Sequence, residues 1–373
     1  MFGLRGLHPD LEVSGFETAF GDIAPRLAQR GHHVTIYCRA SAYSAARRVP
    51  REQGITLVYV PSFGGKNFAA ITSTLLAVLH ALVMQRFDVW FFVNVGMGHH
   101  CALARLSGRP VVMNVDGMDW MRGKWGRFAR AYIYSAARSA VRFCTRLITD
   151  AEAMRLYYRE HFHVETDMIA YGADVECSER PALINAYGVE VRGYYLIVSR
   201  LIPENSLVEM LEGFRRSRST RKLLVVGAAN YEDAFQARLR AIADSDERIS
   251  LVGHVSDQLL LKELWCNCHA YLHGHSVGGT NPALLRGMGY GACVLALDTA
   301  FNREALGDAG MYFRADHDSV AALIDEVDSM SSAVAALGAR GQARIAECYT
   351  WDGVADQYEA VFQSVVAAAL GKS

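Results

Sequence analysis

Short apolar runs alternate with longer amphipathic stretches over most of the chain. The runs are rich in β-branched, aromatic and aliphatic residues, and each is long enough for one strand. In the first half of the chain the predicted strands cover residues 32–38, 55–60, 88–95, 110–115, 146–150 and 167–171. Helices are predicted between them, including one over residues 68–84 and one from about residue 126 to residue 145. This alternation is typical of βαβ units, so it predicts a doubly wound parallel sheet.

The alternation stops near residue 171 and restarts at residue 194. The stretch between is polar, contains a proline and several glycines, and is interpreted as a linker. Further strands are predicted at residues 194–200, 222–227, 248–253, 269–274 and 293–297. The chain therefore predicts two Rossmann-like α/β domains, with a ligand in the cleft between them near the carboxyl ends of the strands.

The first strand of this pattern is nearly absent. Only Met1 and Phe2 precede a turn that contains glycine, whereas a buried strand usually has about five residues. We therefore expect either a stunted sheet or a strand completed by residues upstream of Met1.

The composition fits two ordinary globular domains. The chain has 373 residues, more than the roughly 250–300 at which one core stops growing. Hydrophobic residues make up 51% and charged residues 21%, which excludes a disordered chain. The apolar stretch 68–84 is interrupted by two threonines, a serine and a histidine, so a buried helix is favoured over a membrane span.

The cysteines exclude two classes of protein. Eight are scattered along the chain, and only Cys266 and Cys268 lie close together. This pattern fits neither a zinc site nor a disulfide framework, so no metal is expected. No secretory signal opens the sequence, which favours a reducing cytoplasm.

Charge is distributed unevenly between the two halves. Residues 1–170 carry 20 Lys and Arg against 13 Asp and Glu, a net charge of +7, whereas the remainder carries 18 against 26, a net charge of −8. A basic first half indicates an anionic partner, either a phosphate-bearing molecule or a phospholipid headgroup layer. Chance combined with a basic solvated helix is the alternative. No nucleic-acid partner is expected.

One motif in the second half is typical of a diphosphate site. The sequence SVGGTNPALL follows a predicted strand and supplies Gly278 and Gly279 for close backbone approach, then Thr280 and Asn281 as capping groups before a proline. Backbone N–H groups at such a helix start can bind an anion, although a plain capped turn has the same sequence. Arg200 ends another predicted strand, where it could neutralise phosphate oxygens or form a surface ion pair.

The first half carries weaker signals. Gly15 precedes a predicted helix and could let backbone N–H groups approach an anion. Asp116 follows a strand and could orient or deprotonate an acceptor hydroxyl, or only cap the next turn. Aromatic and basic residues follow as candidates for an acceptor or membrane surface: Trp120, Arg122, Lys124, Trp125, Arg127 and Arg130. Arginines at 130, 138, 142 and 146 are predicted to share one helix face, which a membrane or plain solvent could cover.

Together these segments resemble the retaining glycosyltransferases of family four with the GT-B fold, and in particular the branch of bacterial polysaccharide rhamnosyltransferases. The resemblance spans nearly the whole chain in order. It rests on these segments: GLRG (3–6), GFET (15–18), APRLAQRGHHVTIYCR (24–39), GKN (65–67), NVDGMDW (114–120), KWGR (124–127), YGAD (171–174), SRLIPEN (199–205), HGHSVGGTNPALL (273–285), FNREALGDAG (301–310) and YTWDGVADQYE (349–359).

The resemblance implies a sugar nucleotide bound mainly by the second domain and a lipid-linked saccharide acceptor bound mainly by the first, with no cofactor and no metal. It implies domains at 1–172 and 173–350 and a final helix, 351–373, that returns to the first domain. Asp116 would position the acceptor, and Arg200 would stabilise the departing diphosphate. The remaining donor-binding residues would be Gly15, Asn205, Gly227, Asn230, Tyr231, His275, Gly278, Gly279, Thr280, Asn281, Leu285 and Arg286.

Three positions depart from the family pattern in ways that affect the donor site. Ser14 stands where the first of two glycines is usual before FET, which narrows the room for backbone approach at Gly15. Asn205 stands where a lysine is common, and Arg286 stands where a glutamate usually accepts hydrogen bonds from donor hydroxyls. Arginine cannot accept, so that contact would be lost. The expected function is transfer of a hexose or deoxyhexose such as rhamnose in envelope or exopolysaccharide synthesis, by a cytoplasmic protein at the inner face of an anionic membrane. The alternatives are a weakened GT-B binding protein and, more remotely, a nicotinamide-dependent dehydrogenase, which lacks its glycine motif here.

Overall fold

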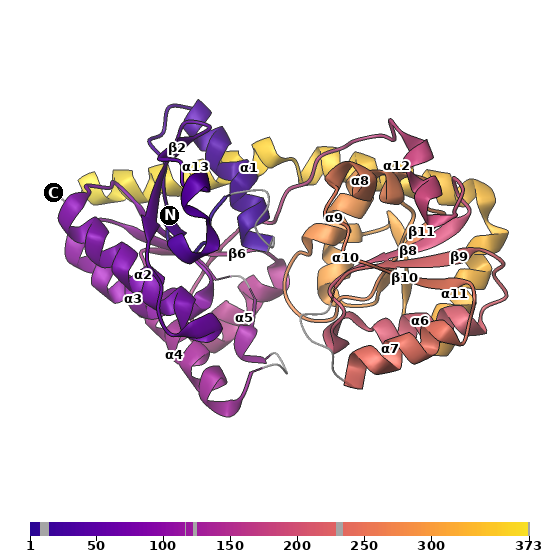
Figure 1. The fold of residues 1–373 in the computed structure, drawn as a ribbon. Helices are drawn as coiled ribbons and strands as arrows, with labels where there is room; N and C mark the ends of the chain where they lie inside the picture. Colours follow the sequence, from indigo (N-terminus) through magenta and orange to yellow (C-terminus); the bar gives the residue numbers. More distant parts are fainter. Residues whose placement is uncertain (8–14, 116, 122–124, 229–233, 372–373) are drawn as a thin grey trace. The chain divides into compact units, whose positions relative to one another are not determined.

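The computed structural model describes residues 1–7, 15–115, 117–121, 125–228 and 234–371 (Figure 1). The chain divides into two compact units. Unit 1 consists of Met1–Tyr171 together with Trp351–Ser373, and unit 2 of Gly172–Thr350. In both units the apolar runs of the sequence form the strands, because parallel strands with helices on both faces must be buried along their length.

Unit 1 contains a mostly parallel sheet in two pieces. Its strands are β1 (Thr35–Arg39), β2 (Arg51–Glu52), β3 (Ile55–Val60), β4 (Trp90–Val93), β5 (Val111–Asn114), β6 (Arg146–Thr149) and β7 (Asp167–Met168). The strand orders are β1-β3-β2 and β4-β5-β6-β7, and only the short β2 runs antiparallel to its neighbour.

The first residues of the chain join these two pieces. The Phe2 N–H donates to the Phe91 oxygen at 2.9 Å, and the Phe2 oxygen accepts from the Val93 N–H at 3.0 Å. On the other side, the Met1 oxygen accepts from the Tyr37 N–H at 3.1 Å. The segment thus occupies the place of a central strand between β1 and β4, although it forms only one isolated bridge. The stunted first strand is therefore present, and the buried Phe2 ring makes it part of the core.

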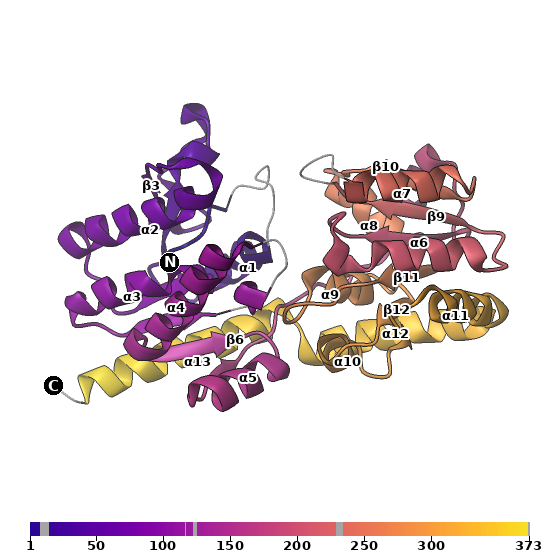
Figure 2. The same ribbon diagram turned by 90° about the horizontal axis from the view of Figure 1, so that it is seen from below.

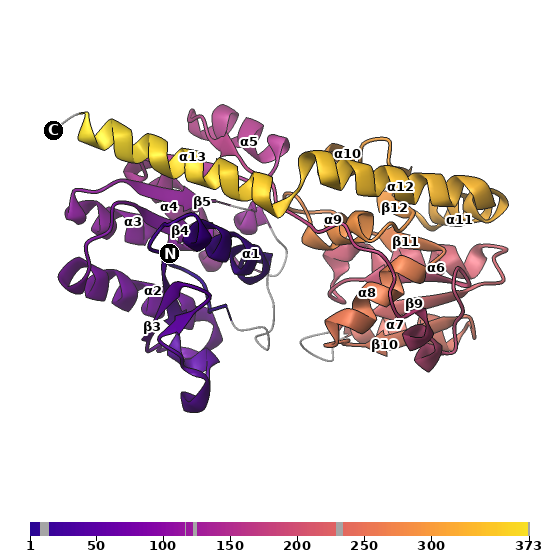
Figure 3. The ribbon, with the colours of Figure 1, turned by 90° about the horizontal axis from the view of Figure 1, so that it is seen from above.

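Helices cover both faces of the unit 1 sheet. They are α1 (Gly15–Gln29), α2 (Gly65–Met84), α3 (Gly98–Ala104), α4 (Arg127–Phe143), α5 (Glu152–Phe162) and α13 (Trp351–Leu370). Short 3₁₀ turns add η1 (Ala40–Ala42), η2 (Ala45–Arg47), η3 (Val95–Met97), η4 (Arg105–Ser107) and η5 (Asp119–Met121). Helices α2, α3 and α4 pack side by side on one face (Figures 1 and 2), while α1 and α13 pack together on the other (Figure 3).

The last helix is fixed in unit 1 by polar contacts. The buried Asn114 side chain, at the end of β5, donates to the Tyr358 hydroxyl at 2.7 Å. Arg26 on α1 forms an ion pair with Asp352 at 2.9 Å. Helix α13 therefore belongs to the core of unit 1 although unit 2 lies between it and the rest of that unit in sequence.

Unit 2 contains one six-stranded parallel sheet in the order β10-β9-β8-β11-β12-β13. Its strands are β8 (Tyr194–Val198), β9 (Lys222–Val226), β10 (Ile249–Gly253), β11 (Ala270–His273), β12 (Val294–Leu297) and β13 (Gly310–Phe313). Its helices are η6 (Pro181–Tyr187), η7 (Pro203–Asn205), α6 (Leu207–Arg216), α7 (Ala234–Asp244), α8 (Gln258–Asn267), α9 (Pro282–Gly289), α10 (Ala300–Leu306), α11 (His317–Ser329) and α12 (Ser331–Cys348).

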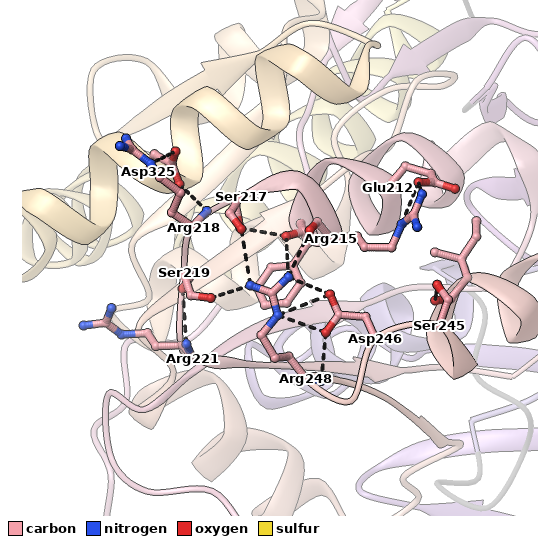
Figure 4. A network of polar contacts seen from close by, with 12 residues as sticks. Glu212, Arg215, Ser217, Arg218, Ser219, Arg221, Ser245, Asp246, Arg248 and Asp325 are labelled. Atoms are coloured by element: carbon pink, nitrogen blue, oxygen red, sulfur yellow. Dashed lines mark hydrogen bonds and ion pairs between the residues drawn. The ribbon is translucent and has the colours of Figure 1, made fainter.

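A half-buried arginine closes one end of unit 2. Arg248, just before β10, pairs with Asp246 through two nitrogens at 2.6 and 2.9 Å (Figure 4). Its guanidinium also donates to the backbone oxygen of Arg215 at 3.0 Å and to that of Ser219, and it lies over the Phe214 ring. The Arg215 carbonyl lies in the last turn of α6, where it has no partner within the helix, and Ser219 lies in the segment that follows.

Two sequence expectations for the basic and apolar helices need correction. Helix α4 ends at Phe143, so Arg146 is not on its face but opens β6, where it lies 3.7 Å from Asp167. The helix expected to be buried over residues 68–84 is buried on one side only: Val83 is 82% exposed. Among the described residues, no helix has both the length and the apolar character needed to cross a membrane.

Candidate functional site

The loop after β11 leads directly into α9. Asn281 caps the helix, its side-chain oxygen accepting from the Ala283 N–H at 2.9 Å. Pro282 takes the first helical position, where a missing N–H has no cost. Gly278 adopts a φ of 126°, and both Gly278 and Gly279 are buried. The loop and first turn therefore present backbone N–H groups at the positive end of a helix dipole, which suits an anion.

This loop is held by the turn that follows β8. A side chain at Gly274 would overlap the backbone oxygen of Asn205, so only glycine allows the close approach. Ser276 donates to the Glu204 carbonyl oxygen twice, from its backbone N–H at 3.1 Å and from its hydroxyl at 2.7 Å. The two loops at the carboxyl ends of β8 and β11 therefore form one rigid assembly.

The Asn205 side chain links this assembly to the backbone of Arg200 through hydrogen bonds. The Asn205 amide nitrogen donates to the Arg200 backbone oxygen at 2.8 Å, so the Asn205 side-chain oxygen faces His275 Nδ1, 2.9 Å away. His275 must then carry its proton on Nδ1, because an amide oxygen only accepts. Asn205 is 5% exposed and uses both ends of its side chain. In place of the lysine of the resembled family, Asn205 thus fixes backbone positions and supplies no charge.

The Arg200 guanidinium is exposed beyond the end of β8. Its backbone is fixed by the Asn205 contact and by the Ile202 N–H, which donates to the same carbonyl oxygen at 2.9 Å. Gly227, at the end of β9, lies so close that a Cβ there would overlap the Ser199 oxygen. Gly227 is therefore required for packing beside Arg200, whether or not it also contacts a ligand.

His273, the last residue of β11, is neutral. Its Nδ1 lies 2.9 Å from the Tyr271 hydroxyl, which in turn donates to the Val198 oxygen at 3.3 Å. Because that hydroxyl donates to the carbonyl, it accepts from His273. Burial, together with the smaller effect of the nearby His275, lowers the pKa of His273 to about 3. His273 therefore adds no positive charge to the site.

Arg286 lies on the second turn of α9 and points toward α8. Its Nη1 donates to the Gln258 side-chain oxygen at 3.3 Å. Gln258 directly follows residues 252–257, the segment that the resemblance places near the base and ribose. Arg286 is therefore neither free in solvent nor bonded to the glycine loop, but sits at the edge of the segment expected to hold the nucleoside.

The remaining predicted donor residues fall into two groups. Leu285 is completely buried and Thr280 is 7% exposed, so Leu285 supports the helix and offers no side chain to a ligand. Asn230 and Tyr231 lie outside the described residues.

In unit 1, the segment GFET forms the first turn of α1, which begins at Gly15. The Glu17 carboxylate on that turn is 8% exposed and accepts from the Arg5 N–H at 2.9 Å. The Tyr43 hydroxyl accepts from the Leu7 N–H at 2.8 Å. Glu17 and Tyr43 thus hold the glycine-containing turn after the first strand against α1, a role that the sequence pattern alone did not indicate.

The predicted acceptor residues are only partly placed. Asp116, Arg122 and Lys124 lie outside the described residues, so the proposed acceptor contact of Asp116 has no geometry here. Trp125 is half-buried. Trp120 was expected at the surface and is instead 8% exposed, because its ring packs against aromatic residues of α4 and α5.

Arg127 and Arg130 are exposed on the first turn of α4, as a surface role requires. No group of three His, Cys, Asp or Glu side chains that could hold a metal ion occurs within the part of the chain that the structure describes.

Several solved structures share the fold of this chain. HepE from Anabaena, in complex with UDP and glucose, superposes with a TM-score of 0.78 over 98% of this chain and 100% of that chain, at 15% identity. Sucrose-phosphate synthase from Thermosynechococcus elongatus gives 0.80 over 99% and 98%, at 13% identity. A glycosyltransferase from Rickettsia africae gives 0.73 over 97% of both chains, at 12% identity. No curated protein sequence matches the chain.

Two family models match in succession. Residues 13–176 match the model described as Glycosyltransferase Family 4, and residues 192–332 match Glycosyl transferases group 1. Each model covers most of one half of the GT-B architecture. The chain is a glycosyltransferase of the GT-B fold.

Several residues of this glycosyltransferase escaped the sequence analysis. Ser276, Glu204 and Tyr271 carry no chemical motif, and their contacts depend on two strands that are adjacent in the sheet but about seventy residues apart in sequence. Gly274 was visible in the sequence as part of HGH, but only the approach of the Asn205 backbone shows why it must be glycine.

Proposed function

We propose that this glycosyltransferase transfers a hexosyl or deoxyhexosyl group, with rhamnose favoured, from a nucleoside-diphosphate sugar to a lipid-linked saccharide with retention of configuration. It would act in envelope or exopolysaccharide synthesis, in the cytoplasm at the inner face of an anionic membrane. The observation that carries the donor half of this proposal is the rigid assembly of the α9 glycine loop with the backbone of Arg200.

The donor site follows from charge. A nucleoside diphosphate would meet the loop N–H groups and the Arg200 guanidinium, and the loop and the Arg200 backbone are fixed before the ligand arrives. Such preorganised groups stabilise a leaving diphosphate more in the transition state than in the ground state. HepE, which shares the fold, was solved with UDP, with UDP and glucose, and with UDP-glucose, which supports a diphosphate donor here.

The acceptor half rests on the resemblance. Asp116 would hold the acceptor hydroxyl while the departing phosphate assists its deprotonation, which accounts for retention by attack on the same face. In this scheme Asp116 orients the nucleophile, and the larger contribution comes from the charge opposite the phosphate. No metal is expected to take part.

Arg286 would contact the nucleoside only as a hydrogen-bond donor. Through its position beside Gln258 it can donate to a ribose hydroxyl oxygen, where the resembled family accepts from that hydroxyl. A second candidate function follows from the same residue: a GT-B protein that binds a sugar nucleotide or partner but transfers weakly.

The experiment is a transfer assay with purified protein. Radiolabelled dTDP-rhamnose, UDP-glucose and UDP-N-acetylglucosamine are each offered with a diphosphate-linked lipid saccharide. We expect labelled lipid from at least one donor, most with dTDP-rhamnose, and an α-configured product from an α-configured donor. Nucleotide binding by calorimetry with no transfer from any donor would establish the binding protein instead.

Arg286→Glu separates the two readings of that residue. If Arg286 has been recruited to the ribose, the substitution raises KM for the donor. If Arg286 is a defect, the substitution raises kcat/KM. Arg240→Glu, also exposed in unit 2, is the matched control for the charge change.

A further inference from the structure

Helix α2 has an apolar stripe on its exposed side, in which Thr72 stands between Phe68 and Leu75. Phe68, Leu75, Leu79 and Val83 recur at spacings of seven, four and four residues, so they lie on one helix face. Their exposed fractions are 60%, 37%, 46% and 82%. The opposite face of α2, with Ala77, is buried against the sheet. Isolated apolar side chains on a surface are ordinary, but a stripe along a whole helix is not.

Helix α4 lies on the same face of the sheet and exposes arginines. Helix α3 contacts both α2 and α4, and the three helices lie side by side in two views (Figures 1 and 2). Arg130, Arg138 and Arg142 are exposed along α4, at spacings of eight and four residues that keep them on one side. Phe128, at the start of the helix, is 94% exposed.

The short turn η4, which follows α3, continues this pattern. Leu106 is 75% exposed and lies between Arg105 and Arg109, both exposed. Helices α2, α3 and α4 contain no aspartate or glutamate. The outward sides of α2, η4 and α4, here called the α2–α4 face, thus combine apolar side chains with positive charge from arginine.

We propose that the α2–α4 face docks on a bilayer of anionic phospholipids, with the α2 stripe entering the headgroup region and the α4 arginines contacting lipid phosphates. This inference rests on the proposed function, because it assigns the surface by which the enzyme reaches a lipid-linked acceptor. It replaces the expected contact through Trp120, whose ring is buried. Apolar residues that enter the interface beside arginines that stay at phosphate depth are the arrangement of a peripheral membrane helix.

The chemistry of the face favours lipid over a protein partner. Arginine side chains extend and keep their charge at the level of phosphates, and each adds attraction to an anionic layer without needing a shaped partner. A folded protein partner would have to match an apolar stripe on one helix and a row of like charges on another. A lipid surface matches both because its phosphates and acyl chains lie at different depths.

The experiment is vesicle co-sedimentation of the full chain, without donor or acceptor. Vesicles of phosphatidylcholine alone are compared with mixtures of phosphatidylcholine and phosphatidylglycerol. We expect binding to the mixed vesicles, weakened by high salt. The triple variant Leu75→Ser/Leu79→Ser/Val83→Ser and the double variant Arg138→Gln/Arg142→Gln should each reduce the partition coefficient about tenfold or more.

Matched controls lie in unit 2, where Val191 is 54% exposed and Arg238 is exposed. Val191→Ser and Arg238→Gln should leave vesicle binding unchanged. Circular dichroism melting should show the serine variant as stable as the parent, since it exposes fewer apolar groups and removes none from the core. Wild-type protein that fails to bind mixed vesicles, or variants that bind like the parent, would overturn the proposal.

Two further measurements distinguish membrane docking from dimer formation and from a failure of the proposed function. If light scattering shows a dimer that the serine variant breaks, the face joins two copies of the chain and the membrane proposal is wrong. Transfer to a water-soluble acceptor should be the same in the serine variant as in the parent. Vesicle binding without any transfer would contradict the proposed function alone, whereas transfer without vesicle binding would contradict the docking surface alone.

Discussion

The two units share the same strand–helix architecture, but helix α4 of unit 1 and the segment that ends α6 in unit 2 use their arginines differently. In unit 2, arginines at the end of α6 pair with aspartates of α11, as in Arg216 with Asp318 at 2.8 Å and Arg218 with Asp325 at 2.8 Å. In unit 1, α4 carries its arginines on a helix layer that contains no acidic residue. Positive charge after α6 therefore cross-links unit 2, whereas Arg138 and Arg142 lie exposed on α4.

The largest expected effect tests whether unit 2 binds the diphosphate of the sugar donor. Arg200→Ala should lower kcat/KM for transfer by about 10²–10³-fold, because it removes one preorganised charge opposite the leaving diphosphate. Steady-state kinetics with the best donor measures this loss. Arg238→Ala, exposed in the same unit, is the control. An Arg200 variant as active as that control would show that the diphosphate is bound elsewhere.

Acid should destabilise unit 2 through His273. Burial lowers the pKa of this imidazole from 6.5 to about 3, so between these values the unfolded chain binds a proton that the folded chain excludes. The free energy of unfolding should fall with decreasing pH in this window, by up to about 1.4 kcal/mol per pH unit for this one group. Urea unfolding at several pH values measures the slope. His273→Gln, which can still donate to Tyr271, should flatten it, and an unchanged slope would contradict the assignment.

Arg248 should matter to unit 2 alone. Arg248→Ala removes the pair with Asp246 and leaves the last carbonyls of α6 without their donor (Figure 4). We expect a loss of about 2 kcal/mol in the free energy of unfolding. Amide hydrogen exchange resolved by peptide should show faster exchange in α6 and β10 and no change in α1 or α13. Arg314→Ala, whose side chain is 80% exposed beside Asp316, should change stability by less than about 0.5 kcal/mol.

The smallest expected effect concerns an arginine of unit 1. Arg146 is half-exposed and lies 3.7 Å from Asp167, so Arg146→Ala should cost less than about 1 kcal/mol. The same hydrogen-exchange measurement on β6 and β7 tests this. A loss as large as that of Arg248→Ala would mean that the β6–β7 edge of unit 1 depends on an arginine cross-link, as the packing of α1 against α13 does through Arg26 and Asp352.

The sequence predicted strands well and contacts poorly. The run Ile55–Val60 became β3 with the predicted bounds, because alternating β-branched residues between turn signals specify a strand locally. The strand β13 was missed, because Gly310–Phe313 has only four residues and so short a run gives little periodicity. Arg146 was placed on the face of α4 because it continues the spacing of the helix arginines, whereas in the sheet it pairs with Val112 of β5.

Contacts between distant segments left no signal in the sequence. Whether Trp120 faces solvent or α5 depends on where two later helices return, and periodicity does not report that. The tautomer of His275 follows from Asn205, seventy residues earlier, and only their proximity shows it. The candidate diphosphate loop was visible because its glycines and proline act within one turn.

The interrupted path of unit 1 has a consequence during synthesis. Unit 2 is one continuous segment, Gly172–Thr350, and all of it is translated before α13. Unit 1 must wait for Tyr358 to reach Asn114 before its core is complete. The unit whose first residues are made first therefore cannot be completed until the last helix of the chain is made.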